Sequence, residues 1–337
     1  MPPEWAPHER TWMEFPTENF TFTADDGWLE RCRDAWASVA NTIAEFEPVS
    51  MVCNLGEAEI ARALVSDNVL LYETPTGDAW CRDSGPTFLV HPDGRLGAVH
   101  WTFNGWGDRG FSDPTDEQHV GGFIAGLAGA EIFRSSMVNE GGGIHVDGDG
   151  TVLVTETVQL DTNRNPDWNG EQVDLELKSY LGIEKAIWLP RGLSRDYGRY
   201  GTNGHVDICA CFVEPGLVLA HAQLDPAHPD FEVTREYIAM LRATTDAKGR
   251  PLNVVEVPAP TVIDDEDGFV DWSYLNHYVC NGAVILCSFD DANDDVAADI
   301  LSRVYAGREI VLHDARDIFA CGGGIHCITQ QEPAPLR

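Results

Sequence analysis

The chain repeats one unit, in which a β-hairpin is followed by a helix and then by a single strand. Turn residues such as Pro-Asp-Gly or Asn-Gly separate pairs of short apolar segments, which is typical of hairpins. Hairpins are predicted at 87–90 with 96–101, 144–146 with 152–155, 206–213 with 217–220, and 274–280 with 283–288. Helical spacing of apolar residues follows at about 116–129, 171–181, 229–243 and 294–305, and short apolar strands such as 186–189 and 309–312 come next. Stacking of such units buries their apolar faces, so the repeat constrains the whole fold.

One polar residue stands at the start of each hairpin, and these residues are separated by 57, 65, 71 and 51 positions. They are Asp83, Glu140, His205, Asn276 and Cys327. The similar spacings predict five repeats around an axis, with each repeat presenting one side chain to a common centre.

The last repeat ends after one hairpin strand, so its missing partner must come from elsewhere. The apolar segment 10–15 is expected to pair with it and close the ring, ahead of a helix near 28–43 and a strand at 49–53. No Pro/Gly/Ser-rich linker divides the chain, and we expect a single domain over residues 1–337.

Two glycine runs open similar strands near the middle and the end of the sequence. Gly141-Gly142-Gly143 follows Glu140, and Gly322-Gly323-Gly324 leads to Cys327. Glycine lets a ligand approach the backbone closely, so the two runs are interpreted as two walls of one active site, one with an acid and one with a thiol.

The net charge and the number of cysteines restrict the kinds of partner and of site that the chain can have. With 22 basic and 55 acidic residues the net charge is −33, which argues against nucleic acid and anionic membranes and favours a small cationic molecule. Nine cysteines, an odd number without a CxxC pair, argue against a disulfide framework or a zinc site. The N-terminal segment does not resemble a signal peptide, so a cytoplasmic location is expected, and a homo-oligomer is possible.

The strand period suggests which histidine serves the thiol. Residues two apart on a strand share a face, so His205 and Asp207 are predicted to point the same way. Neighbours point to opposite faces, so His326 is not expected to be the base for Cys327, and His205 is the candidate.

A thiol, an imidazole and two carboxylates, Asp83 and Asp207, suit a guanidinium substrate. Carboxylates bind the paired N–H groups of a planar guanidinium, and a thiolate attacks its carbon. Trp80 is placed to stack on the guanidinium plane. Neither a metal-binding motif nor a nucleotide-binding glycine motif is found, so no cofactor and no metal are expected.

The chain resembles the agmatine deiminases of the guanidine-modifying, or pentein, superfamily, in segments that span nearly its whole length. These are residues 4–13, 78–87, 103–107, 140–148, 163–166, 188–193, 202–207 and 322–331. The resemblance implies a five-bladed α/β-propeller without a cofactor. It also implies hydrolysis of agmatine to N-carbamoylputrescine and ammonia, a step of putrescine and polyamine biosynthesis.

The resemblance also assigns roles to residues of this chain. It implies Cys327 as the nucleophile and His205 as the acid and base. Asp83 and Asp207 hold the guanidinium, and Glu140 contacts the substrate or orients His205. Asn276 lines the site.

Three features depart from the family pattern: Cys321 stands where a further glycine is usual, the segment before Asn276 is short, and residues 194–200 replace an acidic stretch. Arg195 and Arg199 in that loop, with Arg109, leave a carboxylate-bearing guanidine open as an alternative substrate. An amidinotransferase and a non-catalytic binder of cationic metabolites are further alternatives.

Overall fold

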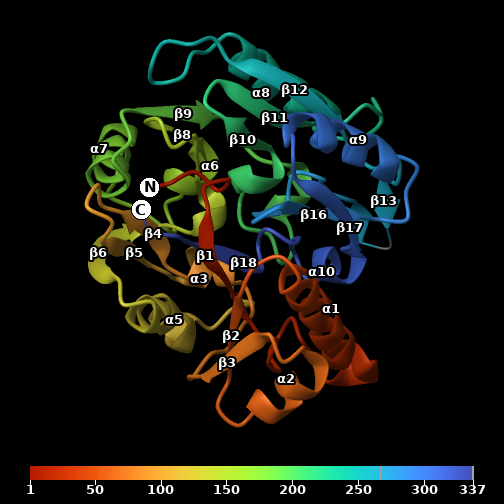
Figure 1. The fold of residues 1–337 in the computed structure, drawn as a ribbon. Helices are drawn as coiled ribbons and strands as arrows, with labels where there is room; N and C mark the ends of the chain where they lie inside the picture. Colours follow the sequence, from red (N-terminus) through yellow and green to blue (C-terminus); the bar gives the residue numbers. More distant parts are fainter. Residues whose placement is uncertain (266, 336–337) are drawn as a thin grey trace.

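The computed structural model describes residues 1–265 and 267–335. Within them, five sheets of three or four strands lie around a common centre, and the longer helices cover the outside (Figure 1). This mixed α/β arrangement matches the five predicted repeats.

Four of the sheets share one topology, an antiparallel hairpin followed by a strand that is parallel to the second strand of the hairpin. Their strands are β4 (Thr87–Val90), β5 (Leu96–Thr102) and β6 (Glu131–Val138); β7 (His145–Val146), β8 (Thr151–Thr155) and β9 (Lys185–Leu189); β10 (Ala210–Glu214), β11 (Leu217–Ala222) and β12 (Asn253–Pro258); and β15 (Tyr278–Cys280), β16 (Ala283–Ser288) and β17 (Glu309–Asp314).

A helix precedes the third strand of each of these sheets. A parallel strand pair needs a long crossover, and the helix supplies it while covering the sheet. The helices are α5 (Pro114–Leu127), α7 (Gly170–Leu181), α8 (Asp230–Arg242) and α9 (Asp294–Val304). The predicted helices are confirmed to within about two residues at each end.

The fifth sheet joins the two ends of the chain, as predicted. It has the order β18 (Thr329–Pro333), β1 (His8–Glu14), β2 (Val49–Cys53) and β3 (Val69–Glu73). β1 runs antiparallel to β18 and parallel to β2. Trp12 Nε1 donates to Glu332 Oε2 at 2.7 Å across the β1–β18 pair, so the C-terminal repeat is completed by the N-terminal strand.

The helix predicted near 28–43 is α1 (Trp28–Ile43); it contacts α10 (Arg316–Ala320), and its buried apolar residues belong to the same core cluster as buried residues of the fifth sheet. All nine cysteines are buried, and none of them is in a disulfide. Among the described residues, we find no helix whose length and apolar character would let it cross a bilayer.

The prediction that the site residues lie on strands is wrong. Strands predicted from 206 and 274 begin only at Ala210 and Tyr278. The centre is instead lined by short turns ahead of the strands: α3 (Cys81–Ser84) and the 3₁₀ turns η2 (Gly141–Gly143) and η4 (Val206–Ile208). There, carboxylates rather than neighbouring strands accept the backbone N–H groups of Gly142, Gly204 and His205.

Candidate active site

Six predicted side chains meet at the centre of the ring, and none is more than 7% exposed. They are Asp83, Glu140, His205, Asp207, Asn276 and Cys327. Gly142 shows how closely they converge, because a Cβ atom added there would lie 2.5 Å from His205 Nδ1, 2.9 Å from Asp207 Oδ2 and 3.1 Å from Asp83 Oδ1. The glycine run therefore leaves the space in which these groups meet, as the sequence suggested.

His205 lies between two carboxylates. Its Nε2 is 3.3 Å from Oε2 of Glu140, and its Nδ1 is 3.8 Å from Oδ2 of Asp83. Burial lowers the pKa of His205, but Asp83 and Glu140 outweigh burial and raise the pKa to about 9. The imidazole is therefore protonated at neutral pH and can serve as an acid.

Glu140 is held by Arg164, a residue that the sequence did not single out. Arg164 Nε donates to both carboxylate oxygens of Glu140 at 3.0 and 3.1 Å, and both side chains are fully buried. Burial raises the pKa of Glu140, but Arg164 and His205 lower it below its ordinary value. Glu140 thus stays charged and faces Nε2 of His205.

Asp83 is fixed by two donors. Its Oδ1 accepts from the backbone N–H of Gly142 at 2.9 Å, and its Oδ2 accepts from Trp106 Nε1 at 2.8 Å. Burial raises the pKa of Asp83; His205 opposes this, whereas Glu140 and Asp207 add to it. A cation that binds beside Asp83 therefore relieves the repulsion among three buried carboxylates.

Cys327 lies against Asp207 and Asn276. Its sulfur is 3.5 Å from Asp207 Oδ2, and its backbone N–H donates to Asn276 Oδ1 at 3.2 Å. Burial, Asp207 and Asp83 raise the pKa of Cys327 well above its ordinary value. A Cβ at Gly323 would lie 2.9 Å from both the sulfur and Cζ3 of Trp80, so the indole edge lies close to the thiol.

Three buried polar atoms around this centre lack a hydrogen-bond partner among the described residues. They are His205 Nδ1, Asp207 Oδ1 and Asn276 Nδ2. Such atoms are costly unless a ligand or water pairs with them, so a polar ligand would fit here. A free carboxylate oxygen beside a thiol fits an N–H donor such as a guanidinium.

The strand on which the choice of His205 was argued is not formed. His205 directly precedes the turn η4 and Asp207 lies within it, so the two residues do not share a strand, yet both approach Gly142. Both nitrogens of His326 are taken up by carboxylates, Asp207 through Nδ1 and Glu4 through Nε2, each at 2.8 Å. His326 is thus bonded away from the sulfur, in line with the prediction.

Glu4, Arg164, Trp106 and His326 contact the site residues, and the sequence reasoning assigned none of them a role. Each lies within a segment that resembles the family: residues 4–13, 163–166, 103–107 and 322–331. That resemblance was the available signal, but it did not show which side chains touch.

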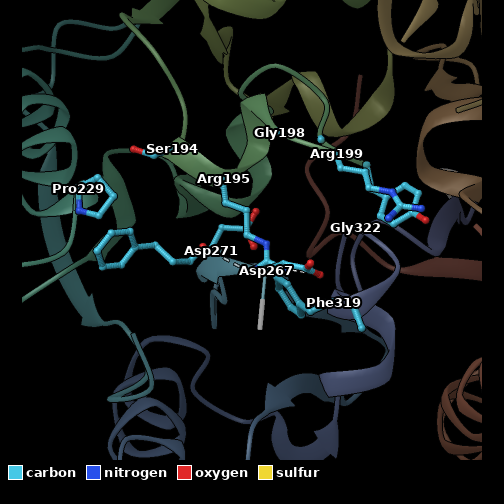
Figure 2. A pocket seen from close by; sticks show the side chains of 13 residues that line it. Ser194, Arg195, Gly198, Arg199, Pro229, Asp267, Asp271, Phe319 and Gly322 are labelled. Carbon is cyan, nitrogen blue, oxygen red and sulfur yellow. Dashed lines mark hydrogen bonds and ion pairs between the residues drawn. The ribbon is translucent and has the colours of Figure 1, made fainter. Parts of the chain in front are cut away.

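A cavity of about 380 Å³ reaches the glycine run ahead of Cys327 at Gly322, and none of the six site residues lines it. Figure 2 shows Arg195 close to Asp271 and Asp267 in this cavity, with Arg199 nearer to Gly322. Burial raises the pKa of Asp271 to about 7.

The three arginines proposed to meet a substrate carboxylate differ in their contacts. Arg195 Nη1 donates to both oxygens of Asp265 at 2.8 Å. Arg109 donates to the side chain of Asn203 and to the carbonyl groups of the loop at residues 197 and 198. Arg199 instead lies over the rings of Tyr200 and Phe20, at 4.6 and 5.4 Å from their centroids.

The sequence and the fold match known proteins along almost the whole chain. The family model of the Porphyromonas-type peptidyl-arginine deiminases matches residues 1–333. The chain is 56% identical over 334 residues to a Streptomyces coelicolor protein provisionally named agmatine deiminase, with 99% of this chain and 98% of that protein covered. It is 39% identical over 361 residues to the agmatine deiminase of Ectopseudomonas mendocina, with 99% and 95% covered.

The solved structure of the agmatine deiminase of Enterococcus faecalis has the same fold. It superimposes with a TM-score of 0.93 at 32% sequence identity and covers 100% of this chain and 96% of that chain. The chain therefore belongs to the Porphyromonas-type peptidyl-arginine deiminase family, together with these agmatine deiminases.

Proposed function

We propose that the protein hydrolyses agmatine to N-carbamoylputrescine and ammonia. The observation that carries this proposal is the convergence of Cys327, His205, Asp83 and Asp207 on the space beside Gly142. The names of the relatives at 56% and 39% identity support agmatine as the guanidine that binds there.

The guanidinium lies between Asp83 and Asp207, and its N–H groups donate to carboxylate oxygens that include Oδ1 of Asp207. Its positive charge offsets the two carboxylates that raise the pKa of Cys327, so binding favours release of the thiol proton to solvent, from which it returns when the product leaves. The Cys327 thiolate then attacks the guanidinium carbon, and a tetrahedral adduct forms through a new C–S bond.

His205 supplies the proton for the leaving group. The imidazolium protonates one nitrogen of the adduct, the C–N bond breaks, and ammonia leaves while a thiouronium remains on the sulfur. The neutral imidazole then takes a proton from water, and the oxygen of that water adds to the same carbon. Collapse of this second adduct breaks the C–S bond, returns the thiolate and yields a ureido product, and ammonia carries away the remaining proton as ammonium.

Ammonia release from purified protein tests the proposal. With agmatine as the guanidine, we expect stoichiometric ammonia and N-carbamoylputrescine without any added amine acceptor. Cys327→Ala is expected to abolish release, whereas Cys53→Ala, which removes a buried thiol from β2, is expected to retain it. Undiminished turnover by Cys327→Ala contradicts the mechanism, and dependence on an added amine indicates an amidinotransferase instead.

One observation favours a second candidate, the deimination of a guanidine that carries a carboxylate, such as arginine or an arginyl C-terminus. The Arg199 guanidinium lines the cavity beside Gly322 and packs on aromatic rings, where a carboxylate can reach it. A panel of agmatine, arginine and a guanidino acid ranked by kcat/KM separates the two candidates, and agmatine in last place rejects the first.

A further inference from the structure

His326, the neighbour of the thiol in sequence, bridges two buried carboxylates. Its Nδ1 is 2.8 Å from Asp207 Oδ2 and its Nε2 is 2.8 Å from Glu4 Oε1, and the imidazole is only 2% exposed. Burial raises the pKa of Asp207 and of Glu4, but His326 contributes to lowering both below their ordinary values. Two ionised carboxylates only accept hydrogen bonds, so both ring nitrogens of His326 donate and the ring is an imidazolium.

Glu4 is itself fixed by two further groups. Arg82 Nη1 donates to Glu4 Oε1 at 3.3 Å, and His145 Nε2 lies 3.5 Å from Glu4 Oε2. The N–H of Phe212 donates to Nδ1 of His145, so the ring proton of His145 is on Nε2, which faces Glu4. Two carboxylates are thus balanced by the cations of His326 and Arg82, as a buried charge cluster requires.

This cluster decides how Asp207 faces the site. Its Oδ2 contacts His326 and the sulfur of Cys327, while its Oδ1 has no partner among the described residues. A carboxylate that is fixed through one oxygen presents the other in a defined direction, which preorganises it for an incoming N–H group.

We propose that His326 and Glu4 are positioning residues that fix the Asp207 carboxylate through Oδ2, with Oδ1 turned toward the N–H groups of the guanidinium that Cys327 attacks. This inference deepens the proposed function and rests on it for the identity of the substrate. Its testable content is that cation recognition beside Cys327 depends on a histidine that touches neither substrate nor sulfur.

The test compares two alkylating agents that share a leaving group. 2-Chloroacetamidine carries a cationic amidinium, and 2-chloroacetamide is its neutral counterpart. Peptide mass spectrometry follows alkylation of Cys327 by each agent. The rate with 2-chloroacetamidine divided by the rate with 2-chloroacetamide measures cation recognition at the thiol. Loosened packing alone alters both rates together, whereas loss of a fixed Asp207 charge lowers the ratio.

Three variants probe the bridge. His326→Asn keeps a donor for Asp207 without the charge, and we expect the ratio to fall about 10-fold, because the attraction between two charges is lost while a hydrogen bond remains. His326→Phe removes the donor too, and we expect a fall of about 10- to 100-fold. Glu4→Gln hardly changes the side-chain volume and removes one of the two carboxylates that stabilise the His326 imidazolium. We expect a smaller fall in the ratio, and this variant keeps the proposal testable if His326→Phe does not fold.

His228→Asn is the matched control, because His228 is an equally buried imidazole 3.6 Å from a carboxylate, Asp230, outside this cluster. Its ratio is expected to match that of the unaltered protein. Unchanged ratios in His326→Asn and Glu4→Gln overturn the proposal, as does an equal fall in His228→Asn.

The test does not require turnover, so it is separable from the proposed function. If the unaltered protein prefers the amidine but releases no ammonia from agmatine, the substrate proposal fails and the role of His326 is still measured. If agmatine is turned over with the same KM and kcat by His326→Asn, the positioning role fails and the proposed function stands.

Discussion

His205 Nε2 lies 3.3 Å from Oε2 of Glu140, on the side of the ring opposite to the nitrogen that faces Asp83. The imidazole is therefore flanked by carboxylates at both nitrogens, and their charges outweigh the cost of burying its cation. This flanking keeps the proposed acid protonated in a site that solvent hardly reaches.

The alkaline side of the pH profile should report His205. Its pKa is raised to about 9, so the imidazolium is present below that pH and is lost as the pH rises through it. We expect kcat/KM for agmatine to fall above about pH 9, and kcat/KM reports groups of the free enzyme.

Glu140→Gln removes one of the carboxylates that raise the pKa of His205, so this alkaline limb should move to lower pH. A limb that stays in place in the variant would assign it to another group.

Gly142→Ala should inactivate the enzyme through crowding. The new methyl group would lie 2.5 Å from His205 Nδ1 and 2.9 Å from Asp207 Oδ2, so both side chains must move. We expect kcat/KM to fall about 100-fold or more, since displacements near 1 Å have that effect. Gly126→Ala in α5 is the control, because its methyl group meets no atom within 4 Å and activity should be unchanged.

Breaking the buried pair of Arg164 and Glu140 should destabilise the fold. Arg164→Leu leaves the buried Glu140 carboxylate without the guanidinium that donates to both of its oxygens, and we expect a loss of about 3–5 kcal/mol in the free energy of unfolding. Arg191→Leu breaks an exposed pair with Glu236 and should cost no more than about 1 kcal/mol. Urea denaturation measures both, and equal losses would contradict the assigned role of burial.

Arg199→Ala tests the charge beside the cavity. Removal of a cation reduces repulsion of the agmatine ammonium and removes a partner for a carboxylate. We expect kcat/KM for agmatine to be retained or to rise, and kcat/KM for arginine to fall. In the unaltered protein, added salt should reduce the effect of the Arg199 charge on kcat/KM for either substrate, because salt screens exposed charges. A loss confined to agmatine would contradict this prediction.

The repeat could be predicted from sequence because its signals are local. Turn residues mark the hairpins, and helical spacing marks α5, α7, α8 and α9, so their positions followed from neighbouring residues. Pairing of β1 with β18 is long-range, yet it followed from counting strands, since the last repeat lacked one.

The local conformation of the site was not predictable in the same way. Residues 206–208 are apolar and acidic in alternation, which favours a strand, but Asp196 accepts the N–H groups of Gly204 and His205 and stabilises a turn. A side chain nine residues away in sequence thus accepts the N–H groups that a neighbouring strand would otherwise accept. The alternation of apolar and polar residues does not predict that contact.

The residue types and their order determined by themselves the reaction class: a cysteine, a histidine and paired acids at repeat-equivalent positions, with glycines that clear the space between them. Only the tertiary structure decided which groups touch. Glu4 reaches His326 across 322 residues, and Arg164 selects Glu140 from many acids. The physical reason is that a buried charge without a partner is strongly destabilising, and the fold alone determines which charges are buried together.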